Sequence, residues 1–263
     1  MQPRDGARWR KEAPAPTDSL WISGRRPVQE ALRAGLPARH LLLRGPVRTG
    51  LLAELRREAV LRGVPGEEVD NAELDRVMRH TEHRGAALQL EPLPERSLEQ
   101  ELPALEQARR PLLLVLDGLQ DPQNFGAVAR SAEAAGVTAL VISRWAQAPL
   151  SDAAFRASAG ALAWLPVLVA EELSEALLWL GRRGYARLGL SERAEKTPAD
   201  YRPAGPLALV LGGEGRGLSQ RVRECLDLEL RIPMQGRIGS LNASVAAAVL
   251  LFSFGAREEP RAE

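Results

Sequence analysis

Short apolar runs that alternate with helical stretches from residue 111 onward constrain the fold of this chain most strongly. The runs predicted as strands buried on both faces are 112–116, 139–143, 165–169, 187–190, 207–211 and 228–232, and the stretches predicted as helices are 125–135, 171–182 and 241–254. Buried strands that alternate with helices are typical of a parallel sheet covered on both faces. The sequence therefore predicts an α/β fold with a parallel sheet in this part.

The N-terminal third has a different pattern. Residues 20–92 predict a compact α/β unit, with helices at 27–34, 50–62 and 72–79 and strands at 40–44 and 86–90. Prolines among mixed charges predict a flexible tail at 1–19 and a linker, with at most one short helix, at 93–110. The expected domains are therefore 20–92 and 111–263.

Several classes of protein are disfavoured by composition. Polar residues interrupt the longest uncharged stretch, 238–256, and its apolar part of about ten residues is too short to cross a bilayer. No secretory signal is visible. With Cys225 as the only cysteine, a disulfide within the chain is impossible, which favours a cytoplasmic protein. Three histidines and one cysteine do not readily make a zinc site, so we expect no metal.

Basic charge is concentrated near the N-terminus. Residues 1–62 hold 13 basic and 6 acidic side chains, whereas the whole chain has a net charge of only +1. Of the 35 basic residues only Lys11 and Lys196 are lysines. Arginine suits phosphate groups and stacks on bases. Genomic codon bias also explains an excess of arginine, so composition leaves both codon bias and a polyanionic partner open.

The first polar segment that follows a predicted strand is 117–130, DGLQDPQNFGAVAR. Ligands of open α/β sheets bind beyond the carboxyl ends of the strands, so such segments are candidate sites. Asn124 is placed to cap the helix expected from Phe125, and Arg130 follows six residues later. Taken alone, the segment fits an ordinary helix cap and a solvated arginine better than a binding site.

Two further segments follow predicted strands. LGGEGRGLS, at 211–219, has four glycines and one acid, Glu214, but neither the P-loop ending nor the G-x-G-x-x-G spacing of dinucleotide folds. Its glycines suit close approach of a ligand or a tight connection alone. In 232–252 a glycine-containing loop is followed by Ser240 or Asn242, either of which can open an alanine-rich helix. The N-terminal amides of such a helix can hold a ligand.

Together, the blocks NFGAVAR, LGGEGRGL and IPMQGRIGSLNASVAAA, in this order, resemble the three motifs of the SpoU (TrmH) family of RNA 2′-O-ribose methyltransferases. The segment 21–92, with ISGRRPVQEALRAG and TEHRGAALQLEP, resembles the family's N-terminal RNA-substrate-binding domain. The likeness is greatest to the branch that acts on guanosine in 23S ribosomal RNA. Arg26, Arg84 and Ala243 depart from the usual His, Gln and Val of these motifs, which weakens the assignment of an RNA target.

The resemblance implies properties that the residue pattern does not show. They are a SPOUT-like domain with a trefoil knot, S-adenosyl-L-methionine as methyl donor, and a homodimer with composite active sites. Carried over by motif, the catalytic positions are Asn124, Arg130, Glu214, Ser240 and Asn242, and the donor-binding positions are Gly212, Ile232 and Leu241. No metal is required.

The resemblance implies that Arg130 accepts the proton of the attacking hydroxyl, but the chemistry of its side chain suggests another role. We expect Arg130 to clamp an RNA phosphate and stabilise the developing alkoxide, because a guanidinium is a poor base. Asn124 would orient Arg130, Glu214 would brace the glycine loop, and Ser240 and Asn242 would position the nucleotide or that loop. The alternatives are a tRNA ribose 2′-O-methyltransferase of the same family and an RNA-binding protein without catalysis. The glycine spacing argues against a nucleotide-binding oxidoreductase.

Overall fold

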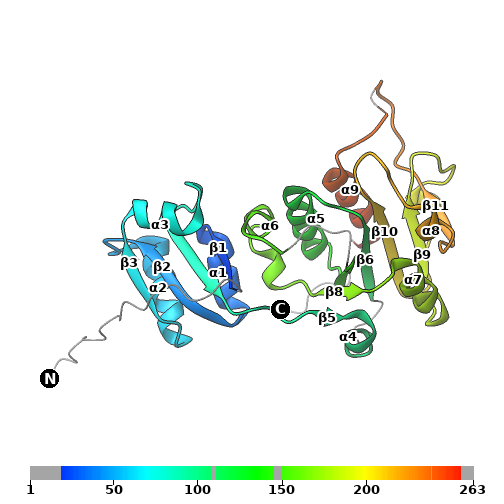
Figure 1. Ribbon diagram of the computed structural model, residues 1–263. Helices are drawn as coiled ribbons and strands as arrows, with labels where there is room; N and C mark the ends of the chain where they lie inside the picture. The colour runs from blue at the N-terminus through cyan, green and yellow to red at the C-terminus, as the bar shows by residue number, and fades with distance from the viewer. Residues whose placement is uncertain (1–18, 108–110, 145–149, 238, 256–263) are drawn as a thin grey trace, which may run out of the picture. The chain divides into compact units, whose positions relative to one another are not determined.

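A computed structural model describes residues 19–107, 111–144, 150–237 and 239–255 (Figure 1). The chain divides into two compact units, 1–93 and 94–263. Each unit has its own sheet.

The first unit is a four-stranded sheet with three helices. Its elements are β1 (Leu20–Ser23), α1 (Arg25–Arg33), β2 (Ala38–Arg44), α2 (Gly50–Leu61), β3 (Gly66–Val69), α3 (Asn71–Met78) and β4 (Ala86–Leu90). The strand order is β1-β4-β2-β3, with β4 antiparallel to both neighbours and β2 parallel to β3. All the helices and strands predicted for this unit are present. Two additional strands, β1 and β3, have only four residues each, too few to show a period.

The second unit is a parallel sheet of seven strands. Its elements are β5 (Arg96–Ser97), α4 (Leu98–Leu105), β6 (Leu112–Asp117), α5 (Pro122–Ala134), β7 (Ala139–Ser143), α6 (Asp152–Ala157), η1 (Ala161–Ala163), β8 (Val167–Ala170), α7 (Leu173–Arg182), β9 (Ala186–Leu190), η2 (Pro198–Asp200), β10 (Leu207–Gly212), α8 (Gln220–Arg223), β11 (Leu228–Leu230) and α9 (Ala243–Gly255). The strand order is β11-β9-β10-β6-β7-β8-β5, and all neighbours are parallel.

Helices cover both faces of this sheet, as predicted. Figure 1 shows α5, α6 and α9 on one face and α4, α7 and α8 on the other. The central strands β6 and β10 are buried along almost their whole length, which explains their continuous apolar sequences. The predicted α/β fold with a parallel sheet is therefore confirmed. The knot that the resemblance implies stays a prediction.

The segment predicted as a linker, 93–110, contains β5 and α4, and both belong to the second unit. β5 pairs with β8, and Leu98 and Leu102 of α4 are fully buried against the strands. These two leucines are one helical turn apart. The charged residues around them and Pro103 make this apolar spacing hard to recognise in the sequence. The second unit therefore begins before residue 111.

Helices α5 and α6 pack closely at Gly126. A β-carbon there would lie 2.3 Å from the Ala154 carbonyl oxygen and 2.6 Å from the Ala157 β-carbon. We predict that Gly126→Ala destabilises the protein by about 1–3 kcal/mol, the usual cost of overpacking a core. Urea denaturation followed by circular dichroism measures this. Gly205→Ala, whose β-carbon would have its nearest contact at 3.9 Å, is the control. Equal stability of the two variants would contradict the prediction.

The described residues lack two features, a membrane-spanning helix and a metal-binding cluster. None of their helices is long and apolar enough to span a membrane. They also contain no cluster of three or more histidine, cysteine, aspartate or glutamate side chains that could hold a metal ion.

Candidate active site

The direction of strand order reverses at β6 in the second unit. From β6 the chain continues to β7 and β8 on one side, and β10 lies against β6 on the other. The last residue of β6, Asp117, is paired with the last residue of β10, Gly212. The loops that follow β6 and β10 therefore start side by side at a topological switch point. This is the place where open α/β sheets bind ligands.

The turn after β10, residues 213–219, is fixed by its own backbone and by Asp117. The Asp117 carbonyl accepts a hydrogen bond from the Gly213 amide at 2.8 Å, and its carboxylate accepts one from the Ser219 amide at 2.6 Å. The Gly217 amide donates back to the Gly213 carbonyl at 3.0 Å. We call residues 212–219 the glycine turn. Asp117 was not predicted as a site residue, although its position at the end of a buried strand was a usable signal.

Two glycines leave no room for a side chain in the glycine turn. A β-carbon at Gly212 would lie 2.1 Å from the Gly217 carbonyl carbon, and one at Gly213 would lie 2.3 Å from the Gly118 carbonyl oxygen. Gly217 has a φ of 64°, in the left-handed region that favours glycine. Closure of the turn itself therefore requires these glycines.

Helix α5 begins earlier than predicted. Its cap is Asp121, whose carboxylate accepts hydrogen bonds from the amides of Gln123 at 3.0 Å and Asn124 at 3.4 Å, and Pro122 is the first helical residue. The prediction that Asn124 caps a helix starting at Phe125 is therefore wrong. An Asp-Pro pair provides both the capping acceptor and a φ already suited to a helix. The Asn124 side chain is left available for other contacts.

Three of the predicted catalytic residues form one hydrogen-bonded chain. The Asn242 side-chain amide donates to Asn124 Oδ1 at 3.0 Å, and the Asn124 amide donates to Glu214 Oε1. Asn242 Oδ1 also accepts hydrogen bonds from the Ser244 amide at 2.9 Å and the Ser244 hydroxyl at 2.6 Å, which caps α9. The chain Asn242–Asn124–Glu214, the polar triad, thus joins the starts of α5 and α9 to the glycine turn.

Arg130 and Ser240 lie outside the polar triad. Arg130 is exposed on α5, and within the described part of the chain it has neither an ion pair nor a hydrogen bond to Asn124. Six helical residues correspond to about 9 Å of rise, which separates the two side chains along the axis. Ser240 is exposed in the segment before α9. The structure therefore supports contact of Asn124 with the glycine turn rather than with Arg130.

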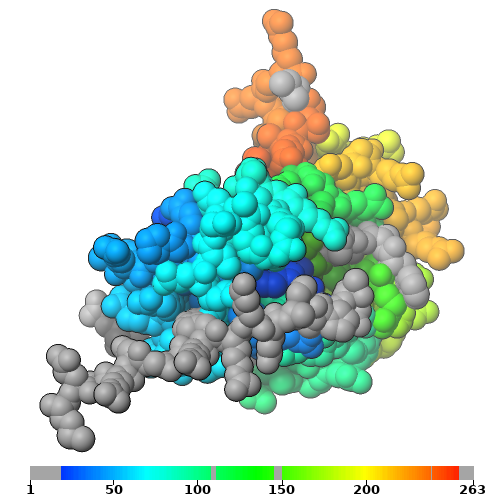
Figure 2. All heavy atoms as spheres, turned by 60° about the vertical axis from the view of Figure 1, so that its left-hand side comes forward, coloured from blue at the N-terminus to red at the C-terminus, as the bar shows by residue number. Residues whose placement is uncertain are grey.

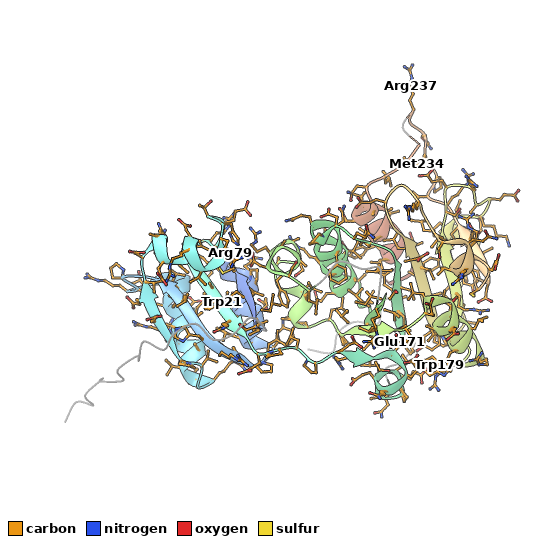
Figure 3. All side chains as sticks on the ribbon, viewed as in Figure 1. Trp21, Arg79, Glu171, Trp179, Met234 and Arg237 are labelled. Carbon is orange, nitrogen blue, oxygen red and sulfur yellow. The ribbon has the colours of Figure 1, made fainter. Side chains whose placement is uncertain are left out.

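The predicted donor-binding residues lie at three places in the second unit. Gly212 ends β10, Ile232 follows β11 and is half-buried, and Leu241 directly precedes Asn242 and is 38% exposed. Residues 234–237, between β11 and α9, project from the rest of this unit in Figure 2. Figure 3 shows its Met234 and Arg237 pointing away from the sheet. Assignment of these residues to a methyl donor stays a prediction.

Residues 111–252 match the profile of the SpoU rRNA Methylase family. The chain belongs to this family. As a SpoU methylase it is an RNA methyltransferase, and its residues 21–96 match a second family, described as RNA 2′-O ribose methyltransferase substrate binding. The match over 21–96 lies mainly in the first unit, and the match over 111–252 lies in the second unit. Together they extend over most of the chain.

Relatives of this SpoU methylase include a protein of Mycobacterium avium named an uncharacterized tRNA/rRNA methyltransferase. It is 38% identical over 243 residues, which are 92% of this chain and 79% of the relative. The SpoU methyltransferase AviRb of Streptomyces viridochromogenes, solved with AdoMet, has a TM-score of 0.74 at 28% identity, covering 90% of this chain and 89% of AviRb. A solved RNA 2′-O ribose methyltransferase has a TM-score of 0.73 at 31% identity, covering 90% of this chain and 87% of the other.

Proposed function

We propose that this SpoU methylase transfers a methyl group from S-adenosyl-L-methionine to the 2′-hydroxyl of a guanosine in 23S ribosomal RNA, as a cytoplasmic enzyme. The observation that carries the proposal is the polar triad. It brings residues from all three candidate motifs, distant in sequence, to the switch point of the sheet. AviRb, a relative with the same fold, is solved with AdoMet.

The glycine turn and the polar triad fit a methyl donor held mainly by backbone. Asp117 accepts hydrogen bonds from the Gly213 and Ser219 amides and so holds both ends of the turn. Gly212, with Ile232 and Leu241 from the segment before α9, would hold the donor. When bound, S-adenosyl-L-methionine supplies an electrophilic methyl group on its sulfonium.

The remaining site residues would act on the RNA. Arg130 is exposed and lacks an ion pair among the described residues, so it is available to bind a phosphate and stabilise negative charge on the attacking oxygen. Ser240 would contact the target nucleotide. Asn124, Glu214 and Asn242 would hold the glycine turn in register with α5 and α9. The chain's part in catalysis is thus alignment and charge stabilisation.

Methyl transfer in vitro tests the proposal. The protein is incubated with unmodified 23S ribosomal RNA and methyl-labelled S-adenosyl-L-methionine, and the RNA is then hydrolysed with alkali. A 2′-O-methyl group blocks cleavage of the next phosphodiester, so the label should appear in alkali-resistant dinucleotides. Label confined to mononucleotide bases would exclude ribose methylation.

A second candidate substrate is tRNA. Relatives such as that of Mycobacterium avium are named for tRNA and rRNA together. The same reaction run on unmodified tRNA transcripts distinguishes the two substrates. Methylation of neither RNA, with intact RNA binding, would indicate an RNA-binding protein that lacks catalysis.

We further propose that RNA binding belongs to the first unit and donor binding to the second. A fragment of residues 94–263 keeps β5 and α4, whose Leu98 and Leu102 belong to the core, whereas one that starts at residue 109 would lose them. We predict that 94–263 binds S-adenosyl-L-methionine as the full chain does and binds RNA much more weakly. Calorimetry and filter binding measure the two affinities. Unchanged RNA affinity of the fragment would contradict this assignment.

We also propose that the protein is a homodimer through α9. Val245, Val249 and Phe252 form an apolar stripe at helical spacing, and they are 48%, 40% and 50% exposed. We predict that Val249→Glu raises the dimer dissociation constant about 30-fold or more, as loss of a central interface contact does. Light scattering across a concentration series measures it. Leu178→Glu, at a similarly exposed leucine on α7, should leave the dimer intact. A monomeric wild-type protein would refute the proposal.

A further inference from the structure

We propose that five arginines at one end of the first unit's sheet bind the phosphates of the RNA substrate. They are Arg25, Arg26, Arg44, Arg79 and Arg84, which we call the sheet-end arginines. The inference rests on the proposed RNA substrate and adds to it the surface that contacts the RNA.

Backbone contacts bring the sheet-end arginines together from three parts of the first unit. Arg25 and Arg26 follow β1, Arg44 ends β2, and Arg79 and Arg84 lie between α3 and β4. Because β4 is antiparallel to β1 and β2, the start of β4 lies beside the ends of both. Figure 3 shows Arg79 in the first unit.

Direct contacts confirm that three of these residues are neighbours. The Arg25 Nε donates to the Arg84 carbonyl at 2.9 Å, and the Arg44 amide donates to the Gly85 carbonyl at 2.9 Å. A β-carbon on Gly85 would lie 3.2 Å from the Arg44 β-carbon. The Arg44 side chain therefore packs beside the residue that follows Arg84.

The loop 79–85, which carries two of the arginines, is held from inside the unit. His83 is buried, its Nδ1 accepts from the Gly85 amide at 3.0 Å, and its Nε2 is 2.9 Å from Asp75 Oδ1. Arg79 and Arg84 themselves have φ values of 58° and 51°, which arginine rarely adopts. A buried histidine thus fixes a loop whose exposed positions include Arg79 and Arg84.

The two ends of this sheet differ in the ion pairs that their arginines form. At the opposite end, Arg33, Arg39 and Arg62 pair with Glu30, Glu91 and Glu58 at 3.6, 2.7 and 3.3 Å. Within the first unit as described from residue 19, no carboxylate pairs with any sheet-end arginine. Glu82 is the one carboxylate in the loop 79–85. Among the described residues, the sheet-end arginines therefore have no ion-pair partner, whereas Arg33, Arg39 and Arg62 at the opposite end do.

Clustered arginines that form no ion pair among the described residues fit a polymeric ligand that carries several negative groups. Guanidinium groups bind phosphate oxygens in a fork, and phosphate contacts provide most of the sequence-independent affinity for nucleic acids. Such contacts set the register of the RNA without reading its bases. The sheet-end arginines would thus hold the RNA while the second unit selects and methylates the ribose.

The test is a matched pair of triple variants. Arg26, Arg44 and Arg84 are all replaced by Gln in one variant, and Arg33, Arg39 and Arg62 are all replaced by Gln in the other, so both lose the same charge. Filter binding to unmodified 23S ribosomal RNA and to tRNA transcripts is measured across a salt series. Removal of three phosphate contacts should make the slope of log affinity against log salt shallower by about 2 and weaken binding about tenfold. The control variant should retain the wild-type slope.

Further readouts separate this inference from the proposed function. The sheet-end variant should raise the KM for RNA, leave kcat near the wild-type value, and bind S-adenosyl-L-methionine normally. Equal effects of the two variants, or an unchanged salt slope in the first, would overturn the inference. If wild-type protein methylates neither RNA but the two variants still differ in RNA binding, the proposed function fails and the sheet-end surface stands. Circular dichroism checks that both variants fold.

Discussion

Replacement of Arg130 by alanine should lower the rate of methyl transfer by about 100-fold to 1000-fold, the loss expected when one oriented charge at the transition state is removed. Arg130 is exposed on α5, and its neighbours Val128 and Ala129, not the arginine, pack in the core. The variant should therefore fold normally. Single-turnover methylation of RNA at saturating donor measures the loss.

Two comparisons make the Arg130 result specific. Donor affinity, measured by calorimetry, should remain at the wild-type value because Arg130 is assigned to the RNA. Arg130→Lys should recover only part of the activity, since lysine keeps the charge but loses the planar fork that binds phosphate. Near-normal turnover of Arg130→Ala would show that the residue is an ordinary surface arginine.

Replacement of Gly212 by alanine should abolish measurable binding of the methyl donor. The added β-carbon would lie 2.4 Å from both the Gly217 carbonyl oxygen and the Leu218 amide nitrogen, so the glycine turn could not close as it does. Because backbone atoms obstruct the added carbon, no side-chain rotation relieves the overlap. Calorimetric titration with S-adenosyl-L-methionine is the measurement.

Gly215→Ala is the matched control within the glycine turn. Gly215 has a φ of 74°, but no atom lies within 4 Å of its expected β-carbon. Alanine there costs about 1–2 kcal/mol of backbone strain without overlap, so donor binding should weaken but remain measurable. If the two variants bind the donor equally well, closure of the turn at Gly212 does not control the donor site.

The fold of the second unit was predictable because its buried strands are nearly continuous apolar runs. Strands such as β6 and β10 are covered on both faces, and their sequences show it directly. Short elements were not predictable on the same grounds. β5 has two residues and α6 has six, which is too short for either to show a clear hydrophobic period.

The members of the polar triad were named from the sequence, but their contacts with one another were not. Asn124, Glu214 and Asn242 follow from the resemblance to the family's three motifs, yet nothing in the spacing shows that Asn124 bonds to both others. That contact depends on the pairing of β10 with β6, which places loops about 90 residues apart side by side. Asp121 displaced Asn124 as the helix cap because Pro122 fixes the first helical residue.

The proposed reaction is ribose methylation of one guanosine in 23S ribosomal RNA. Its most direct test is a map of 2′-O-methyl groups in total RNA from the source organism, with and without the gene for this protein. One 2′-O-methylguanosine of 23S ribosomal RNA should disappear in the deletion strain and return with the wild-type gene but not with Arg130→Ala. A 23S map that is unchanged by the deletion would contradict it.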